Sequence, residues 1–208
     1  MSNENVNHYG KRLVSIMMVV VSMLATGCAE KEEVDKDWVD LGLPSGLLWA
    51  TRNVGASSPE DYGDYFAWRE TTPKDVYDRN TYTKDNIDSE DYTLQPDEDA
   101  ATANYGGRTP SREDWMELER YTTHEWKTIK GVTGWRFTGS NGSSIFIPAA
   151  GTRSGAGLSD ADSRGYYWTS SFYPWVHDPY YYGFWHGGFY SNGYHAYFGL
   201  SVRAVRQK

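Results

Sequence analysis

The C-terminal tract, residues 165–206, constrains this chain more than any other segment. It holds close to half of all Trp, Tyr and Phe residues. Between Phe172 and Phe198 the sole formal charge at neutral pH is Asp178, although 23% of the whole chain is charged, and Gly, Ser, Asn and His separate the rings. Tyr and Trp give large contact area with few rotatable bonds, while Ser, Asn and Gly give adaptable hydrogen bonds, as in antibody-like binding surfaces. The tract therefore predicts a recognition surface.

The alternative is that these rings pack the core of a β-sheet, since Tyr-rich strands suit a half-buried pleat. That interpretation is favoured at the edges of the tract, where Tyr166, Trp168, Phe198, Val202 and Val205 alternate as in strands. In the middle, Pro or Gly interrupts the sequence every few residues, which favours short strands and loops. Because loops lie at the surface, we expect the middle of the tract to expose its rings.

The N-terminus has the pattern of a signal peptide. Lys11 and Arg12 precede an apolar run, residues 13–25, that has the length of a signal-peptide core and is short for a membrane-spanning helix. The run ends in Ala-Thr-Gly-Cys, which resembles the lipobox of bacterial lipoproteins. We therefore expect removal of residues 1–27, acylation of Cys28, and an acidic tether over residues 28–37. The tether resembles the signal that sends some lipoproteins to the outer face of the outer membrane.

The number of cysteines and the net charge exclude or disfavour several classes of function. Cys28 is the only cysteine, so the mature domain has no disulfide and no cysteine-based catalysis. The formal net charge is -8, and loss of Glu4, Lys11 and Arg12 with the signal peptide makes it about -9. An acidic surface without a basic stripe disfavours nucleic-acid binding. Contact with the membrane is expected through the lipid anchor alone.

Residues 38–208 have the length of one domain with its own core. The patterns predict a hairpin over 38–50, short helices from Ser58 and near 99–104, a helix from 111, strands over 134–138 and 144–147, and a last strand over 200–206. The helix at 111 is the firmest, because Ser111 and Asp114 form a capping box and Trp115, Leu118 and Tyr121 follow at helical spacing. Residues 74–95 are polar and are expected to form a surface insertion. Helices early and strands late indicate an α+β domain.

Six motifs in fixed order carry a family resemblance. They are VDLGLPSGLLWA (39–50), YGDYFAW (62–68), RTPSREDW (108–115), IFIPAAG (145–151), YWTSS (167–171) and GLSVRAVR (199–206). Together they resemble the Fib-succ major paralogous domain of secreted and lipid-anchored bacterial proteins, over nearly all of the chain after the tether. Arg69 departs from the Gly that is usual after the second motif.

The resemblance implies a C-type-lectin-like fold, in the variant related to the formylglycine-generating enzymes. Those enzymes act through cysteines, which the mature domain lacks. Some members of the family are variable proteins of diversity-generating retroelements, in which adenines of a template copy are randomised and the altered codons lie in the last part of the domain. Randomised Asn codons never give Lys, Glu, Gln, Met or Trp, and residues 172–198 contain none of these except Trp175 and Trp185. That fits fixed Trp scaffolding between variable positions.

The sequence gives only weak signals for a metal site or a catalytic site. His177, His186 and His195, with Asp178, have the donor types of a zinc site but not the short paired spacing. Residues 95–97 copy the Gln-Pro-Asp of calcium-dependent lectins, and residues 97–99 supply oxygen ligands suited to calcium. Asp160 and Asp162 fit a glycosidase pair or simple turn capping, and turn capping is favoured. No metal and no cofactor is expected.

The sequence therefore predicts a non-enzymatic, surface-displayed ligand-binding lipoprotein, a receptor or adhesin for a protein or glycan. The alternative is a carbohydrate-active enzyme or a carbohydrate-binding accessory protein, because aromatic platforms also stack on sugars. The binding region spans residues 166–198, and its predicted contact residues, expected outward on one face, are Tyr173, His177, Asp178, Tyr180, Tyr182, Phe184, His186, Phe189, Tyr190, Ser191, Asn192, Tyr194, His195 and Tyr197. The predicted supports of that face are Trp168, Trp175, Trp185, Gly199, Val202, Arg203 and Arg206.

Overall fold

The structure, a computed structural model, describes residues 36–208 except 86, 88–91, 174 and 176. Asp35–Lys208 form one compact unit. The predicted signal peptide, Cys28 and all but the last two residues of the predicted tether lie outside the described residues. Among the helices of the described part, none combines the length and the apolar character needed to cross a membrane.

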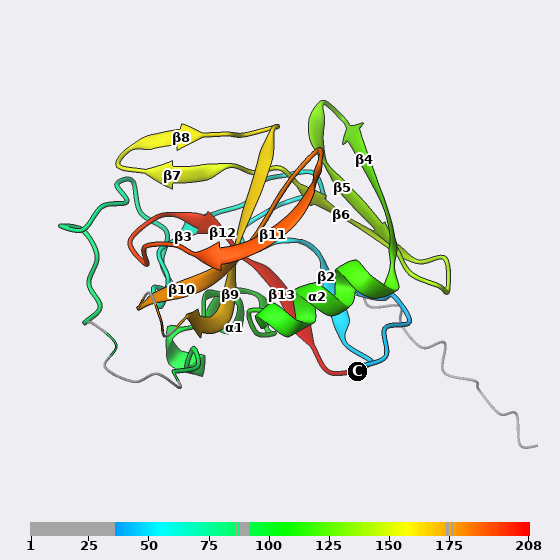
Figure 1. The fold of residues 1–208 in the computed structure, drawn as a ribbon, viewed down its shortest axis with the longest axis horizontal. Coiled ribbons are helices and arrows are strands. Elements are labelled where there is room, and N and C mark those ends of the chain that lie inside the picture. The colour runs from blue at the N-terminus through cyan, green and yellow to red at the C-terminus, as the bar shows by residue number, and fades with distance from the viewer. Residues whose placement is uncertain (1–35, 86, 88–91, 174, 176) are drawn as a thin grey trace, which may run out of the picture. The chain divides into compact units, whose positions relative to one another are not determined.

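The described residues form mainly β-strands with a few short helices (Figure 1). The strands are β1 (Trp38–Asp40), β2 (Leu48–Asn53), β3 (Tyr65–Phe66), β4 (Thr123–Ile129), β5 (Val132–Thr138), β6 (Ser144–Pro148), β7 (Thr152–Ser154), β8 (Gly157–Ser159), β9 (Arg164–Tyr173), β10 (Asp178–Trp185), β11 (Gly188–Gly193), β12 (Leu200–Ser201) and β13 (Arg203–Arg206). The helices are the 3-10 helix η1 (Pro96–Glu98) and the α-helices α1 (Ala100–Tyr105) and α2 (Arg112–Tyr121). This agrees with the α+β class at that coarse level.

The strands form a central five-stranded sheet and smaller sheets around it. The central order is β11-β10-β9-β12-β3, antiparallel except for the parallel pair of β9 and β12. The other sheets are β1-β2-β13, β4-β5-β6 and β7-β8. The tract predicted to bind ligand thus supplies β9, β10 and β11, three neighbouring strands at one side of the largest sheet.

Most local predictions are confirmed because they rest on short-range chemistry. β1 and β2 form the predicted hairpin, and β5 and β6, which correspond to two predicted strands, pair with each other. Asp99 caps α1 by accepting a hydrogen bond from the Ala101 N–H, and Ser111 and Asp114 form the predicted capping box of α2. Trp115 and Leu118 are buried as their spacing predicts, whereas Tyr121 is exposed.

One predicted helix is wrong, and one predicted strand is divided in two. The helix from Ser58 is absent, because the Asp61 carboxylate accepts hydrogen bonds from Ser57 and closes a tight turn that Gly63 then ends at φ +70°. The last strand is interrupted at Val202, whose carbonyl accepts a hydrogen bond from the Val54 N–H. β12 and β13 therefore belong to different sheets.

The central sheet separates two hydrophobic clusters. One cluster lies toward α2 and β4-β6 and includes Trp115, Tyr167, Tyr182 and Phe184. The other includes Phe66, Trp68, Tyr166, Trp168, Tyr181 and Leu200. Successive side chains of a strand point to opposite faces, so neighbours such as Tyr166 and Tyr167 enter different clusters. The predicted core positions Tyr166, Trp168, Val202 and Val205 are buried, whereas Phe198, predicted with them, is half-buried and lies outside the strands.

Arg203, a predicted support residue, is fully buried and joins two sheets. Its guanidinium donates to the carbonyls of Ala50 at 3.0 Å and Phe146 at 2.8 Å. Burial without a carboxylate partner lowers its pKa to about 10. Arg206 lies half-buried with its guanidinium 4.6 Å from the Trp38 ring centre, and Gly199 is buried beneath the Tyr77 ring. These three residues therefore pack within the domain, and their support of a binding face stays a prediction.

Candidate functional site

The predicted contact residues lie on both faces of the β9-β10-β11 layer rather than on one. Register explains this, since Tyr182 pairs with Tyr167 on one face while its neighbour Tyr181 pairs with Trp168 on the other. The prediction of a single outward face is therefore wrong. Pro179 and Gly183 do not break β10 into loops: Gly183 stays within the strand, and the ring of Tyr190 covers the space where a Cβ would project.

Tyr182 and Phe184 are core residues, so their prediction as contact residues is wrong. Tyr182 stacks on Trp115 with ring centres 4.7 Å apart, and its hydroxyl donates to Glu119. Phe184 is 0% exposed and stacks on Tyr167. Phe189 is half-buried and packs against the same cluster, with its ring centre 4.9 Å from that of His124. All three point inward because β10 and β11 cover α2 and the β4-β6 sheet.

Trp175 and Trp185 were predicted as supports of the binding face, and that prediction is wrong because both rings are exposed. Trp175 is 86% exposed on the connection between β9 and β10, and Trp185 is 43% exposed where β10 ends. Neither ring has an inward position, because each lies where the strands turn. Exposed Trp is a frequent energetic centre of protein contacts, so these residues belong to the candidate surface rather than to its frame.

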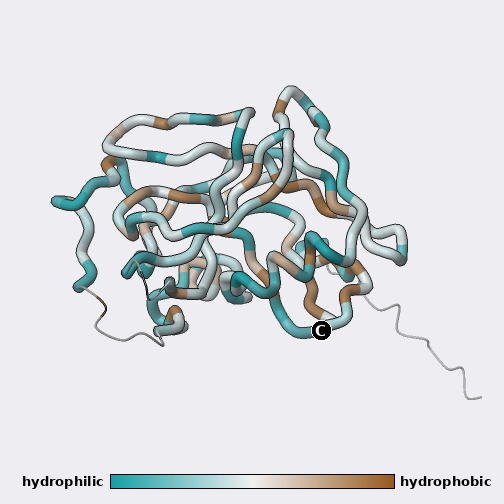
Figure 2. The backbone as a smooth tube through the Cα atoms, viewed as in Figure 1, coloured by the Kyte–Doolittle hydropathy of each residue, from teal (hydrophilic) through white to brown (hydrophobic). Residues whose placement is uncertain are grey.

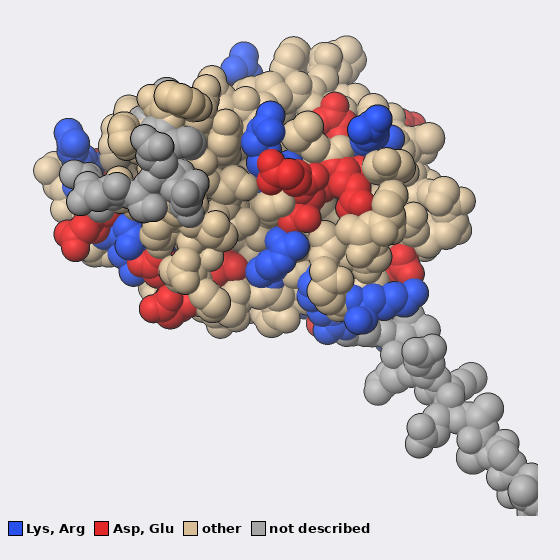
Figure 3. All heavy atoms as spheres, turned by 60° about the horizontal axis from the view of Figure 1, so that its bottom comes forward, with Lys and Arg blue, Asp and Glu red and all other residues tan. Residues whose placement is uncertain are grey.

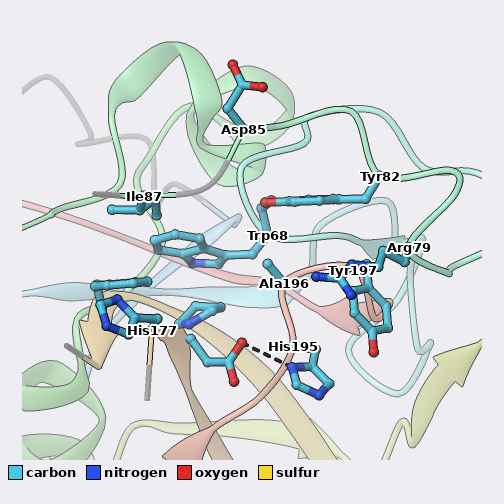
Figure 4. Close-up of a pocket in the computed structure, with 12 residues that line it drawn as sticks. Trp68, Arg79, Tyr82, Asp85, Ile87, His177, His195, Ala196 and Tyr197 are labelled. Carbon is cyan, nitrogen blue, oxygen red and sulfur yellow. Dashed lines mark hydrogen bonds and ion pairs between the residues drawn. The ribbon is translucent and has the colours of Figure 1, made fainter. Parts of the chain in front are cut away.

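A pocket of about 400 Å³ brings part of the tract together with distant segments (Figure 4). Its walls come from three regions: the end of β3, the polar insertion and the tract. The lining residues are Trp68, Arg79, Tyr82, Asp85, Ile87, Phe172, His177, Asp178, Pro179, His195, Ala196 and Tyr197. Four of the predicted contact residues, His177, Asp178, His195 and Tyr197, therefore meet in one hollow.

Hydrogen bonds fix the tract side of this pocket. The carboxylate of Asp178, at the start of β10, lies 3.2 Å from His195 Nδ1, seventeen residues later in the chain. The Tyr194 N–H donates to the Pro179 carbonyl, and the Trp68 N–H donates to the Ala196 carbonyl at 2.8 Å. The His195 ring also stacks on Tyr197 at 5.2 Å. The pocket thus presents an imidazole and a carboxylate in contact with each other, beside half-buried aromatic rings.

The opposite wall comes from Arg79, Tyr82, Asp85 and Ile87, which belong to the segment that the sequence predicted only as a surface insertion. The Tyr82 hydroxyl donates to the Trp68 carbonyl at 3.0 Å, so this wall is bonded to the pocket floor. Figure 4 shows the Arg79 side chain beside Tyr197, and Figure 2 colours much of the insertion as hydrophilic. The eight other lining residues were not predicted: Trp68, Arg79, Tyr82, Asp85, Ile87, Phe172, Pro179 and Ala196. The aromatic residues within a polar insertion were the available signal.

Glu98 anchors the insertion by binding three donors. It accepts hydrogen bonds from Arg69 at 2.8 and 3.0 Å, from Lys84 at 3.3 Å and from the Tyr92 hydroxyl. The bonds from Arg69 hold the pKa of Glu98 at about 2, below its ordinary value of 4.5.

A lowered pKa in the folded state gives a stability contribution that is complete above the unfolded pKa and is lost at lower pH. The free energy of unfolding should therefore fall as the pH drops from about 4.5 to about 2, and Glu98→Gln should remove part of that fall and cost about 1 to 3 kcal/mol at pH 7. Urea titrations at several pH values measure both effects. Glu125→Gln, an exposed change on β4, is the control, and equal pH dependence in the two variants would contradict the assignment.

A second aromatic surface lies on the α2 side of the tract. Tyr173 and Tyr180 stack with ring centres 4.5 Å apart and planes 10° from parallel. The Arg112 guanidinium lies 5.3 Å from the Tyr180 ring centre. Figure 3 shows acidic and basic side chains intermingled on one face of the molecule. Stacked Tyr beside Arg has the composition of a protein-binding patch.

The other predicted contact residues lie apart from the pocket lining. His186 is exposed at the β10-β11 turn beside Trp126, far along the hairpin from the other two histidines. Tyr190 and Tyr194 pack half-buried on the second cluster, the Ser191 hydroxyl donates to the Tyr181 carbonyl, and Asn192 is exposed. Within the described ranges, no group of three His, Cys, Asp or Glu residues is placed to hold a metal.

The acidic motifs have structural partners. Asp99 binds the N–H groups of Ala101 and Thr109, and Glu98 binds the donors described above, so these two of the three carboxylates considered for calcium are engaged by the protein, while Asp97 is exposed. Asp160 accepts from the Tyr166 hydroxyl, and Asp162 accepts from the Thr133 N–H. Both aspartates have positive φ, near 60°, which is typical of turn residues. Both are therefore turn residues, but their carboxylates accept hydrogen bonds from Tyr166 and Thr133 rather than from the backbone of the turn itself.

Comparison of the chain with protein-family models, with curated proteins and with solved structures gave no match in any of the three.

Proposed function

We propose that this chain is a lipid-anchored, surface-displayed ligand-binding protein, a receptor or adhesin rather than an enzyme. The observation that carries the proposal is the pocket in which Asp178 and His195 meet with Tyr197 and the insertion. Binding sites combine aromatic walls with a few fixed polar groups, and this pocket has both. Its volume of about 400 Å³ suits a side chain or one or two sugar rings rather than a large ligand.

We propose further that the exposed aromatic residues around the pocket extend the contact surface. Trp175 is the most exposed large ring of the tract, and Tyr173 and Tyr180 offer a rigid stack on the α2 side. Rigid aromatic anchors with adaptable polar neighbours favour binding because little side-chain entropy is lost. The revised contact set is therefore centred on His177, Asp178, His195, Tyr197 and Trp175.

The C-type-lectin-like fold and the retroelement origin belong to the same proposal. The six ordered motifs support the fold, and the residue types between Phe172 and Phe198 support diversification. The coding DNA offers a direct test. We expect a near-copy of the 3′ end of the gene, differing only where the copy has adenine, next to a reverse transcriptase. Flanking DNA without that copy would contradict the retroelement origin and leave a fixed ligand.

The proposed lipid anchor predicts where the protein is located in the cell, and this can be tested. Cys28→Ser removes the thiol that the lipobox provides for acylation, so the protein should leave the membrane fraction or stay unprocessed. Replacement of Glu30, Glu32 and Glu33 by Ala should keep an acylated protein facing the periplasm. Fractionation and protease added to intact cells measure these outcomes, and full protease protection of the wild type would contradict surface display.

The function itself is tested with the soluble domain, residues 36–208. We expect it to bind a component of a glycan array or of a panel of extracellular proteins and to show no turnover on glycoside substrates. The two kinds of array separate a sugar ligand from a protein ligand. Turnover that Asp160→Asn or Asp162→Asn abolishes would contradict the binding proposal and favour the carbohydrate-active alternative.

A further inference from the structure

Arg69 has a backbone conformation that normally selects glycine. Its φ is +68°, in the left-handed region where a Cβ crowds the following carbonyl. It follows Trp68, the floor of the pocket, and directly precedes Glu70 in the turn that ends β3. A strained non-glycine residue beside a pocket persists only where its side chain makes compensating contacts.

The Arg69 side chain makes such contacts. Its Nε and one terminal nitrogen donate to the two oxygens of Glu98 at 3.0 and 2.8 Å, a bidentate pair. The other terminal nitrogen donates to the backbone carbonyl of Asp85 at 2.9 Å. The guanidinium also lies 5.2 Å from the ring centre of Tyr92, and the side chain is only 14% exposed.

These contacts join the middle of the insertion to its C-terminal end. Asp85 is a lining residue of the pocket wall, while Tyr92 and Glu98 stand where the insertion returns to η1. No other side chain among the described residues bonds both the Asp85 backbone and Glu98. The wall that contains Tyr82 and Asp85 is linked to η1 by this guanidinium and by the longer Lys84–Glu98 contact at 3.3 Å. Thr83 also bonds Glu70, beside Arg69, so Arg69 makes the most numerous bonds of a shared attachment.

We propose that Arg69 is a positioning residue of the binding pocket, which tolerates a left-handed backbone in order to fix residues 79–85 against the tract. The consequence for binding rests on the proposed function of the pocket. The claim that Arg69 positions the wall does not rest on the proposed function, because it concerns only how firmly residues 79–85 are held in the protein without ligand.

Hydrogen exchange on the full chain in detergent tests the claim without any ligand. Arg69→Gly relieves the backbone strain and removes the side chain, so folding is retained while the link is lost. We expect amide exchange over residues 79–85 to rise at least about tenfold, with β9 and β10 unchanged. Glu98→Gln should raise exchange over the same residues, and adding it to Arg69→Gly should add less than twofold.

The lysine variant is the matched control. Arg69→Lys keeps the charge and the strain but cannot make the bidentate pair and the Asp85 bond together, so its exchange should lie between the wild type and Arg69→Gly. Exchange over 79–85 that stays within twofold of the wild type in Arg69→Gly would overturn the proposal. So would an equal rise over β9 and β10, since that result shows general destabilisation. A failure of ligand binding with the expected exchange pattern would instead count against the proposed function alone.

Discussion

Trp168→Ala should lower the free energy of unfolding by about 3 to 5 kcal/mol, because the indole fills the centre of the second cluster. Trp168 is 1% exposed, and its Nε1–H donates to the Phe66 carbonyl at 2.7 Å. The bond ties β9 to β3 across the short strand β12 that separates them. Loss of the ring thus removes both packing and the partner of a buried carbonyl.

Urea unfolding followed by circular dichroism measures this loss. Trp175→Ala is the matched control, because that indole is 86% exposed, and it should change stability by less than about 0.5 kcal/mol. Trp168→Phe keeps a ring but removes the hydrogen bond, so it should fall between the two. A Trp168→Ala loss equal to that of Trp175→Ala would show that the indole is not part of the core.

Phe184→Ala should cost a similar amount, about 3 to 5 kcal/mol, although the sequence pattern predicted a ligand contact there. The ring is 0% exposed and stacks on Tyr167 at 5.7 Å. It also covers Gly165, where a Cβ would lie only 2.1 Å from the ring. Such close packing leaves a cavity that the neighbours cannot fill when the ring is removed.

The adjacent residue provides the comparison. Trp185→Ala removes a larger but 43% exposed ring and should cost less than about 1 kcal/mol. Thermal or urea unfolding of both variants decides the matter. If Phe184→Ala were as stable as Trp185→Ala and ligand binding were lost, Phe184 would be a ligand contact and not a core residue.

The sequence predicted elements whose signals are local. The capping box at Ser111 and the hairpin of β1 and β2 each depend on a few neighbouring residues. The orientation of the tract was not predictable in the same way, because a two-residue period assigns alternate faces but does not say what covers each face. α2 and the β4-β6 sheet decide that Tyr182 and Phe184 point inward.

The candidate site was predictable only in part. The composition of the tract indicated His177, Asp178, His195 and Tyr197, which do line one pocket. The opposite wall could not be predicted, because it is held by tertiary contacts, among them those of Arg69 with its unusual φ, rather than by local propensity.

The central claim is that the pocket binds the ligand, and paired variants test it most directly. The double variant Asp178→Asn, His195→Ala alters the joined pair in the pocket, whereas His186→Ala, Asn192→Ala alters exposed tract residues outside its lining. Affinities of both, with wild type, are measured by calorimetry for the array component that the wild-type domain retains. We predict a loss of about tenfold or more for the pocket pair and less than about twofold for the control pair. Unchanged affinity in the pocket pair, or an equal loss in the control pair, would contradict the claim.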